Sequence, residues 1–265
     1  MSYYFPPQQK PKRWGSVSDI QYAIRKNSEK IYGIDPDSNV LIMPLFWGFP
    51  CLDFSGKNNH GAPEGGVGYH SGGLDFDGTT GYLLIPNDFF VGIASGTFLM
   101  RLSPSVASSG SISAFAGDSV SDYAFQFLLT TTNFYAGFYD GVWRRAVATE
   151  GSDYSWVINE SIQLGVGWDS VSPTVKILFN GQNVGTNYTT AFTQPAKNNL
   201  FIARRSSGNF FNGLIDDIRI NNIAPTAEQI ALFYQRPWDL YRRVGRTYYS
   251  VAAAPSIYIP QIMIF

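Results

Sequence analysis

The 265-residue sequence has little cysteine, little histidine and few charges. The one cysteine, Cys51, excludes an internal disulfide and a metal site built from several cysteines. Charged residues make up 15% of the chain, below the usual quarter or so, whereas Phe, Tyr and Trp together make up 16%. Low charge with many aromatic residues and glycines favours an all-β protein. Either a partner covers much of its surface, or the protein is a weakly charged sandwich.

The sequence also lacks the apolar segments that export or membrane insertion requires. The first residues, "MSYYFPPQQKPKRW", contain no apolar core of a secretory signal. Residues 247–265 are uncharged, but Pro255 and Pro260 interrupt them, so they do not predict a membrane helix. We therefore expect a protein that is neither exported nor inserted in a membrane.

Charge is distributed unevenly along the chain. Residues 1–40 hold six basic and four acidic residues, and residues 236–265 hold four basic and one acidic. The 41–235 segment holds nine basic and fifteen acidic residues. This basic excess is too weak for nucleic-acid binding, which needs a dense basic face. It suits two ends that lie against an acidic neighbour.

From residue 40 onward the pattern indicates β-structure. Apolar runs such as "NVLIMPLF", "GTFLMRLSP", "DYAFQFLLT" and "SIQLGVGWDS" are separated by turn signals. The turns centre on Asp77-Gly78, Asp140-Gly141 and Asn180-Gly181, and the last of these is a strong signal for a type I′ hairpin. Frequent strands without helical patterns between them predict a two-sheet antiparallel sandwich.

Two short helices are expected outside this pattern. Ser18 is the predicted N-cap of the first helix, and Gly33 its stop. Its apolar stripe would be Ile20, Ala23, Ile24 and Ile31. Thr226 is the predicted N-cap of the second helix, which ends before Pro237. Its stripe would be Ala227, Ile230, Ala231 and Tyr234.

Three segments in order carry a resemblance to a known family. "LDFSGKNNHGA", "GGLDFDGTTGYLLIP" and "FNGLIDDIRINNIAPTAEQIALFY" resemble the laminin-G-like jelly rolls of the concanavalin A-like superfamily. The resemblance implies an all-β, two-sheet antiparallel jelly roll over residues 40–235, with a short helix after the last strand. Residues 1–39 would then form an N-terminal arm with a short helix, and residues 236–265 a C-terminal arm.

The resemblance also implies a calcium site. Its ligands would be Asp53, Asn59 and Asp216, because calcium prefers carboxylate and carbonyl oxygens. In the alternative interpretation, Asp53 and Asp216 organise turns by accepting hydrogen bonds from backbone N–H groups. Asp217 would alternate to the opposite face from Asp216 and pair with Arg219 or with an arginine of a neighbouring strand.

Residues suited to catalysis are sparse. Some relatives hydrolyse polysaccharides with closely spaced glutamates on one strand, and glycoside hydrolysis needs two facing carboxylates. The glutamates here do not pair at strand spacing: Glu29, Glu64, Glu150, Glu160 and Glu228. His60 and His70 lie in glycine-rich turns, and Cys51 follows an apolar strand, as a small core residue would. We expect a non-enzymatic protein.

A glycan is one expected partner. Aromatic rings on the strands could stack on sugars: Tyr135, Tyr139, Trp143, Trp156 and Trp168. In the alternative interpretation, rings on sandwich strands fill the core. The sequence does not say which face of each strand meets water.

The chain end carries a second resemblance. "RPWDLYRRVGRTYYSVAAAPSIYIP" resembles termini of proteins encoded among the structural genes of tailed phages. The closing "SIYIPQIMIF" is apolar, and a free apolar strand normally adds to a sheet edge of its own chain or of a partner. The alternative is that both arms fold back on their own sandwich.

These observations predict a non-enzymatic virion structural protein, a capsid decoration or minor capsid component assembled in the host cytoplasm. Its terminal arms would bind the major capsid protein, other virion proteins or copies of itself. The expected anchors are Trp14, Ile20, Ile24, Trp238, Tyr241, Tyr258, Ile259 and Ile262, with Arg242, Arg243 and Arg246 facing acidic groups. The alternative is a glycan- or receptor-binding module of a tail fibre or host-facing appendage.

Overall fold

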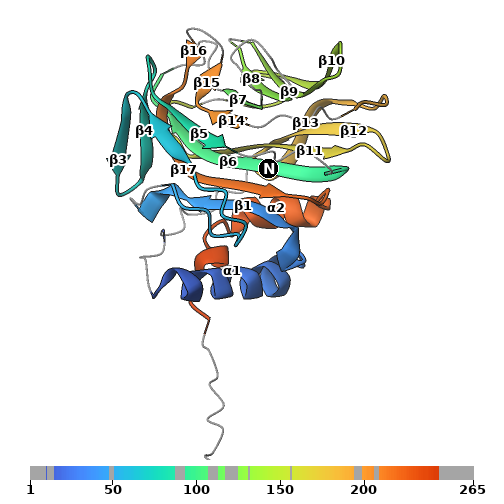
Figure 1. Ribbon diagram of the computed structural model, residues 1–265. Coiled ribbons are helices and arrows are strands. Elements are labelled where there is room, and N and C mark those ends of the chain that lie inside the picture. The colour runs from blue at the N-terminus through green and yellow to red at the C-terminus, as the bar shows by residue number, and fades with distance from the viewer. Residues whose placement is uncertain are drawn as a thin grey trace, which may run out of the picture.

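A computed structural model describes most of the chain. The residues described are 10, 15–47, 51–86, 93–106, 113–116, 125–130, 132–155, 157–193, 199–205 and 209–244. They form two antiparallel sheets stacked as a sandwich, with a layer of helices against one of them (Figure 1). This confirms the all-β jelly-roll class predicted from the sequence.

The sheet next to the helices is called the helix-covered sheet. Its strand order is β3-β4-β17-β6-β11-β12-β13, and β1 pairs with the second half of β17. The bounds are β1 Asn39–Pro44, β3 Val67–His70, β4 Gly73–Asp77, β6 Ser95–Pro104, β11 Ile162–Asp169, β12 Thr174–Phe179, β13 Gln182–Tyr188 and β17 Asn212–Asn221.

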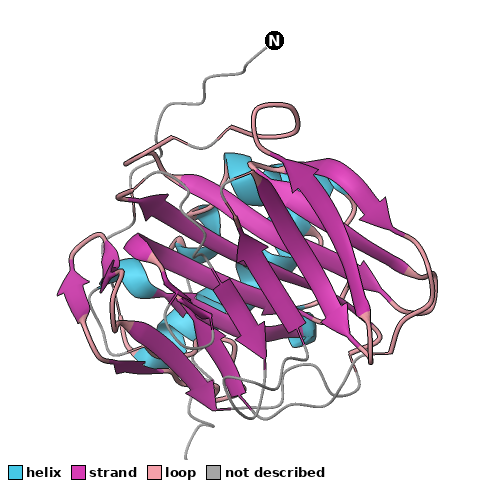
Figure 2. Cartoon of the chain, turned by 90° about the horizontal axis from the view of Figure 1, so that it is seen from above, coloured by secondary structure: helices cyan, strands magenta, loops and turns pink. Residues whose placement is uncertain are grey.

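The opposite sheet is called the second sheet. Its strand order is β2-β5-β14-β7-β8-β9-β10, and β13 joins the two sheets by pairing with both β12 and β10. Figure 2 looks down on this sheet, with the helices behind it. The bounds are β2 Ala62–Glu64, β5 Tyr82–Pro86, β7 Ser113–Ala116, β8 Phe125–Leu129, β9 Asn133–Tyr139, β10 Trp143–Thr149 and β14 Asn199–Ile202; β15 Arg204–Arg205 and β16 Asn209–Phe210 form a separate pair.

The main core lies between the two sheets. Successive side chains of a strand point to opposite faces, so β9 sends Phe134, Ala136 and Phe138 into this core. Aromatic rings from both sheets meet there, for example Phe98 of β6 and Phe127 of β8, whose centroids lie 5.4 Å apart. The alternate positions of β9 therefore point outward from the second sheet.

The turns follow the sequence signals closely. Asn180 and Gly181 have φ of 47° and 80°, as a type I′ turn requires, and they join β12 to β13. Asp140-Gly141 joins β9 to β10. The turn at Asp77-Gly78 instead carries the chain from β4 in one sheet to β5 in the other. Its geometry is fixed by the Asp77 carboxylate, which accepts hydrogen bonds from three backbone N–H groups in the next four residues.

The first helix, α1 (Val17–Tyr32), starts earlier than predicted. Its N-cap is Ser16, not Ser18. Ser16 and Asp19 form a reciprocal capping box: the Ser16 hydroxyl accepts from the Asp19 N–H, and the Asp19 carboxylate accepts from the Ser16 N–H at 3.0 Å. The predicted stop at Gly33 is confirmed by its left-handed φ of 62°.

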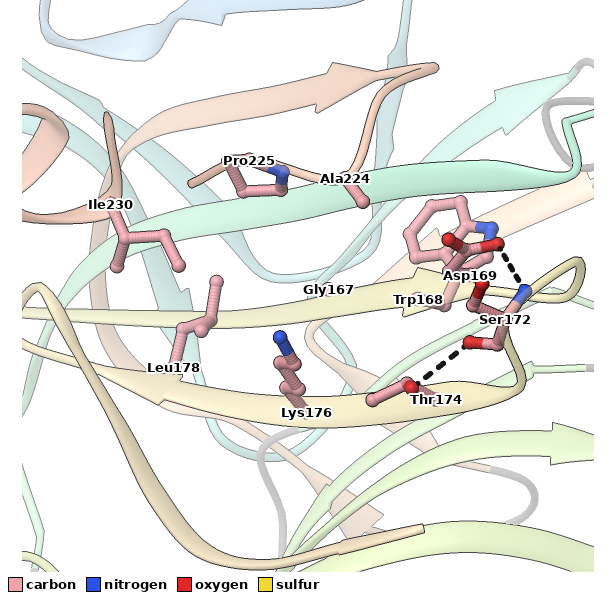
Figure 3. Close-up of a pocket in the computed structure, with 10 residues that line it drawn as sticks. All are labelled: Gly167, Trp168, Asp169, Ser172, Thr174, Lys176, Leu178, Ala224, Pro225 and Ile230. Atoms are coloured by element: carbon pink, nitrogen blue, oxygen red, sulfur yellow. Dashed lines mark hydrogen bonds between the residues drawn. The ribbon is translucent and has the colours of Figure 1, made fainter. Parts of the chain in front are cut away.

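The second helix, α2 (Ala227–Gln235), has the predicted cap. Thr226 and Gln229 form a capping box. The buried side chains are Ile230 and Phe233 rather than the whole predicted stripe. Ile230 faces Leu178 of β12 across a small gap (Figure 3). Short 3-10 turns are η1 Pro36–Ser38, η2 Leu45–Trp47 and η3 Asp239–Tyr241. None of the helices described is long and apolar enough to cross a membrane.

A second core lies between the helix-covered sheet and the helix layer. It contains four residues predicted to anchor the chain to a partner: Ile20, Ile24, Trp238 and Tyr241, which are 0–3% exposed. That prediction is wrong for these four, because α1 and η3 pack on the outer face of the chain's own sheet. Trp14, Tyr258, Ile259, Ile262 and Arg246 lie outside the described residues.

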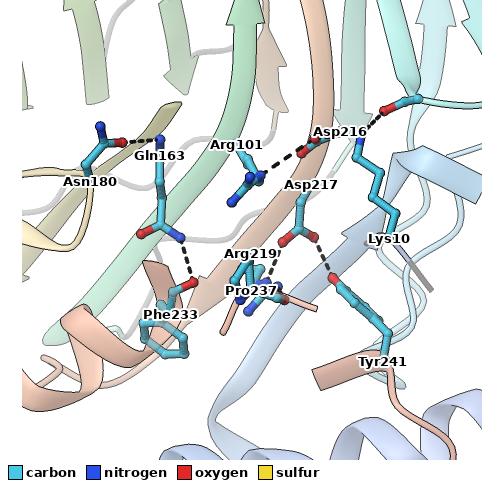
Figure 4. A network of polar contacts seen from close by, with 11 residues as sticks. Lys10, Arg101, Gln163, Asn180, Asp216, Asp217, Arg219, Phe233, Pro237 and Tyr241 are labelled. Atoms are coloured by element: carbon cyan, nitrogen blue, oxygen red, sulfur yellow. Dashed lines mark hydrogen bonds and ion pairs between the residues drawn. The ribbon is translucent and has the colours of Figure 1, made fainter. Parts of the chain in front are cut away.

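The two adjacent aspartates of β17 lie at an irregularity of the sheet. The register of β17 against β6 advances two residues, from Ile215 to Asp217, while β6 moves one. This bulge turns both carboxylates toward the helix layer. Asp216 contacts Lys10 at 2.9 Å and Arg101 at 3.7 Å, and Asp217 contacts Arg219 at 2.6 Å (Figure 4). The expected Asp217–Arg219 pair is confirmed, but the expected opposite orientation of the two aspartates is wrong.

This ionic network holds the segment after α2. The Asp217 carboxylate accepts a hydrogen bond from the Tyr241 hydroxyl, and Arg219 donates to the Pro237 carbonyl. From the helix side, Asn27 donates to the carbonyls of Leu240 and Arg242 at 3.0 and 2.9 Å. Charged and polar groups of β17 and α1 thus clamp residues 237–242 between them.

The helix layer is therefore expected to stabilise the isolated chain. Replacing Ile24, which is fully buried, by Ala should lower the free energy of unfolding by about 2–5 kcal/mol. Val17→Ala is the control, since Val17 lies in the same helix but is 38% exposed, and it should change stability by less than about 0.5 kcal/mol. Urea unfolding of the monomer measures both. Equal, small effects would mean that α1 is detached from the sheet in solution.

Asp216 is expected to make stability depend on pH. Burial raises its pKa from 3.8 to about 6, against the opposing effect of Arg101 and Lys10. Its contribution to stability is therefore full below pH 3.8 and is lost as the pH rises through about 6. Asp216→Asn should gain stability relative to the natural protein over this window, by at most about 1.4 kcal/mol for each unit of pKa elevation.

Urea unfolding between pH 4 and 7 measures this difference. Asp37→Asn is the control, because the exposed Asp37 has a lowered pKa beside Arg25, and the stability that this adds is lost only as the pH falls below the usual value of 3.8. The stability of this variant relative to the natural protein should therefore change little between pH 4 and 7. If the natural protein instead becomes more stable relative to the Asp216→Asn variant as the pH rises, the ion pairs of Asp216 outweigh the cost of burying its charge.

Candidate functional site

Two of the predicted calcium ligands lie together in a turn after η2. The Asp53 carboxylate accepts hydrogen bonds from the backbone N–H groups of Ile42, Ser55 and Asn59 at 3.0, 2.8 and 2.9 Å. It also accepts from the Ser55 hydroxyl at 2.7 Å. The Asn59 side chain donates to the Val40 carbonyl at 2.7 Å. Asp53 thus organises the turn, as in the alternative interpretation.

The third predicted ligand, Asp216, belongs to the ionic network on β17. Its neighbours are the cations Lys10 and Arg101, and in the part of the chain that the structure describes no contact joins it to Asp53. Four donors already occupy the Asp53 oxygens. These surroundings do not fit calcium, which needs free oxygens and no nearby cations. Nor is any group of three His, Cys, Asp or Glu side chains placed to hold a metal among the described residues. Calcium binding stays a prediction.

The residues weighed for catalysis have structural contacts or lie apart. His60 accepts a hydrogen bond from the Asp53 N–H at 3.0 Å. Cys51 is buried, and burial raises the pKa of its thiol to about 11. Glu29, Glu64 and Glu228 lie on α1, β2 and α2 respectively, Glu150 forms an isolated bridge with Tyr154 after β10, and Glu160 lies shortly before β11. The absence of catalytic activity remains a prediction.

A pocket of about 200 Å³ opens on the helix-covered sheet (Figure 3). It is lined by Gly167, Trp168, Asp169, Ser172, Thr174, Lys176, Leu178, Ala224, Pro225 and Ile230. Asp169 accepts hydrogen bonds from the N–H groups of Val171 and Ser172, which hold the β11–β12 turn. The pocket is smaller than the roughly 300–1,000 Å³ of sites for drug-sized ligands, so it is a weaker candidate than the surface described next.

The outward face of β9 and β10 carries a cluster of rings and one guanidinium. Tyr139 and Trp143 are partners across the hairpin, with ring centroids 5.3 Å apart. The Arg145 guanidinium lies over the Tyr135 ring at 4.3 Å and near the Trp143 ring at 5.8 Å. The four residues are half-buried or, for Tyr139, 40% exposed. We call Tyr135, Tyr139, Trp143 and Arg145 the β9–β10 platform.

The platform is positioned by strand alternation and by one glycine. Gly137 lies between Tyr135 and Tyr139 and opposite Arg145. A Cβ at Gly137 would lie 2.0 Å from the Arg144 carbonyl oxygen and 2.6 Å from the Arg145 Cα. The missing side chain lets the two strands approach and leaves room for the guanidinium on Tyr135.

Three of the five rings predicted for sugar contact are therefore on one surface. Trp168 is 1% exposed and packs in the main core against Phe138, so its predicted role is wrong. Trp156 lies outside the described residues. Arg145 was not among the residues predicted from the sequence. Its position two residues after Trp143 on one strand, and so on the same face, is the signal that could have found it.

Comparison with known proteins identifies the fold of the chain and does not address the β9–β10 platform directly. A family model described as the concanavalin A-like lectin/glucanases superfamily matches residues 77–231, more than half of the chain. The sequence search of curated proteins finds no match.

Solved structures share the architecture at low identity. Domain 4 of AbnA, an extracellular GH43 arabinanase from Geobacillus stearothermophilus solved with arabinotriose, is 18% identical with a TM-score of 0.57; the match covers 77% of this chain and 98% of that one. The receptor-binding domain of botulinum neurotoxin type G is 11% identical with a TM-score of 0.59, and covers 75% of this chain. The binding domain of neurotoxin DC, solved with rat synaptotagmin II, is 13% identical with a TM-score of 0.60, again over 75% of this chain.

This chain spans about half the length of the two neurotoxin domains, 51% in each case. Identities this low establish the fold and no function. The family match is broader evidence, because it covers the strands from β5 to β17 and most of α2. It confirms the resemblance seen in the sequence. The chain belongs to the concanavalin A-like lectin/glucanases superfamily.

Proposed function

We propose that the protein is a carbohydrate-binding module and that the β9–β10 platform is its binding surface. The observation that carries this proposal is the grouping of three outward rings and one guanidinium on a single hairpin. Flat rings contact the apolar faces of sugars, and a few polar groups fix the orientation of a ligand. The module binds its ligand without cleaving it.

The platform suits a ligand because it is rigid. Both strands are paired over seven positions, and their inward neighbours are buried core residues. A surface held in place loses little conformational freedom on binding. The arabinanase domain solved with arabinotriose supports the proposal by analogy of fold.

Loss of either exposed platform ring should weaken sugar binding. With the full chain, Trp143→Ala and Tyr139→Ala should each weaken binding to an oligosaccharide identified by array screening by roughly tenfold or more. Tyr69→Ala is the matched control, because Tyr69 is 50% exposed on β3 of the other sheet. Isothermal titration gives the affinities, and thermal melting confirms folding. Unchanged affinity in both platform variants, or no glycan bound by the natural protein, would rule out this surface.

The virion structural role is a second candidate. Its support is the sequence of residues 236–265, which resembles termini of tailed-phage structural proteins and ends in an apolar stretch. Arg242, one of its predicted contacts, already forms an ion pair with Asp239 of its own chain. Capsid partners, self-association and location in a virion stay proposals. A glycan-binding module on a host-facing appendage of a phage would combine the two candidate functions.

Deletion of residues 247–265 tests the structural role. The truncated chain should stay folded, because every member of the second core among the described residues lies at or before Tyr241. It should fail to enter phage particles in an infection complemented with the variant, as measured by the protein content of purified particles. Normal incorporation would remove the arm from any anchoring function.

A further inference from the structure

Most arginines of the described residues pair with an aspartate. Six do so: Arg25, Arg101, Arg144, Arg219, Arg236 and Arg242. Arg145 and Arg204 differ, because each lies against aromatic rings and neither forms an ion pair with a carboxylate of the described chain. The Arg204 Nε is buried and lacks a hydrogen-bond partner.

Arg204 belongs to a second cluster on the second sheet. Its guanidinium lies 4.7 Å from the Tyr82 ring and 5.8 Å from the Phe210 ring. The Tyr82 ring in turn lies 6.1 Å from that of Phe201. Neither Tyr82 nor Phe201 belongs to the main core, whereas their strand neighbours do, so both point outward. We call Tyr82, Phe201, Arg204 and Phe210 the β5–β15 cluster.

The backbone before Arg204 is unusual. Ala203 is fully buried and has φ of 66°, in the left-handed region that an alanine rarely adopts. This residue lies between the end of β14 at Ile202 and the start of β15 at Arg204. The conformation costs of the order of 1–2 kcal/mol, and its effect is to bring the Arg204 guanidinium over Tyr82.

The two clusters lie on the same face at opposite ends of the sheet. Figure 1 has β15 and β16 at one end of the second sheet and β10 at the other. The order β14-β7-β8-β9 places Phe201 and Tyr135 three strand spacings apart, about 14 Å. Between them, Gln126 and Leu128 of β8 also point outward but are 4% exposed, and Phe201 is 9% exposed. Among the side chains that the structure describes, contacts to a ligand would therefore come from the platform and from the half-buried Tyr82, Arg204 and Phe210.

We propose that this face binds one acidic polysaccharide chain, with uronate carboxylates at both Arg145 and Arg204 and sugar rings on the aromatic side chains between and around them. The inference rests on the proposed function and deepens it by naming the ligand class and a second contact region. A guanidinium that lies over an aromatic ring can still pair through its exposed N–H groups with a carboxylate.

Charge also limits how far the bound polysaccharide extends across the sheet. Glu64 of β2 is the register partner of Tyr82 and lies beyond it at the sheet edge. A carboxylate there repels an acidic ligand, so the polysaccharide ends near Arg204 instead of crossing β2. Its path runs from the β9–β10 platform across β8 and β7 to the β5–β15 cluster.

The test uses the full chain, polygalacturonate, and the same polymer after reduction of its carboxyl groups. The natural protein should bind the acidic polymer at least tenfold more tightly than the reduced one. Arg145→Gln and Arg204→Gln should each weaken binding of the acidic polymer by roughly tenfold. Arg25→Gln is the charge-matched control on α1, on the other side of the molecule, and should change nothing.

Ligand length tests the span. Digalacturonate, too short to reach both clusters from the platform, should bind the Arg204→Gln variant as it binds the natural protein. If Arg204→Gln weakened binding of the disaccharide and of the polymer equally, the proposal that one polysaccharide chain spans both clusters would be overturned. Equal binding of acidic and reduced polymers that is still abolished by Trp143→Ala would overturn the acidic ligand and keep the proposed function. No binding of either polymer, or of any glycan, would overturn both.

A final competition experiment distinguishes recognition of sugar rings from attraction to negative charge alone. Polyglutamate of matched charge should compete at least tenfold less well than polygalacturonate, because it offers no sugar rings to the aromatic side chains. Equal competition would identify a general polyanion surface and would contradict the glycan assignment.

Discussion

The ionic network on β17 is the constraint on which the arrangement of the chain depends. Two aspartates and Arg219 are nearly inaccessible to water, and an unpaired charge in such a place is strongly destabilising. Asp217 and Arg219 pair with each other, and the other partners of the network come from elsewhere in the sequence: Arg101 from β6, and Tyr241 and the Pro237 carbonyl from beyond α2. Folding the sheet correctly therefore requires that residues 237–241 return to it.

As a result, the outer faces of the two sheets have different roles: one stabilises the fold and the other is open to a ligand. The outer face of the helix-covered sheet is filled by α1, η3 and the network, with a second core of buried apolar side chains. The outward positions of β9 and β10 on the second sheet instead hold half-exposed rings and a guanidinium. In a two-sheet sandwich with one face closed by its own helices, the remaining face is where a ligand of some length can lie.

Local signals were readable from the sequence because they depend on residues within a few positions. The Asn180-Gly181 turn, the Thr226 cap and the Gly33 stop are confirmed. Contacts between distant segments were not readable. Trp143 and Trp168 both lie on strands of alternating pattern, yet one is outward and the other is core. The bulge that aligns Asp216 with Asp217, and the burial of Ile20 and Tyr241 in the chain's own second core, likewise follow from tertiary packing.

The contrast between two kinds of arginine follows from the same energetics. Arg219 lies deep under the helix layer and is paired with Asp217, because a buried guanidinium without a carboxylate would be too costly. Arg145 and Arg204 are only partly buried, so water can still solvate one edge, and ring stacking supports the other. Arg145 and Arg204, without a carboxylate partner in the described chain, add little to stability and cost little to keep. Each guanidinium stays available to an anionic group from outside. Because both lie beside outward aromatic rings, the anionic group that suits them best is that of a charged sugar.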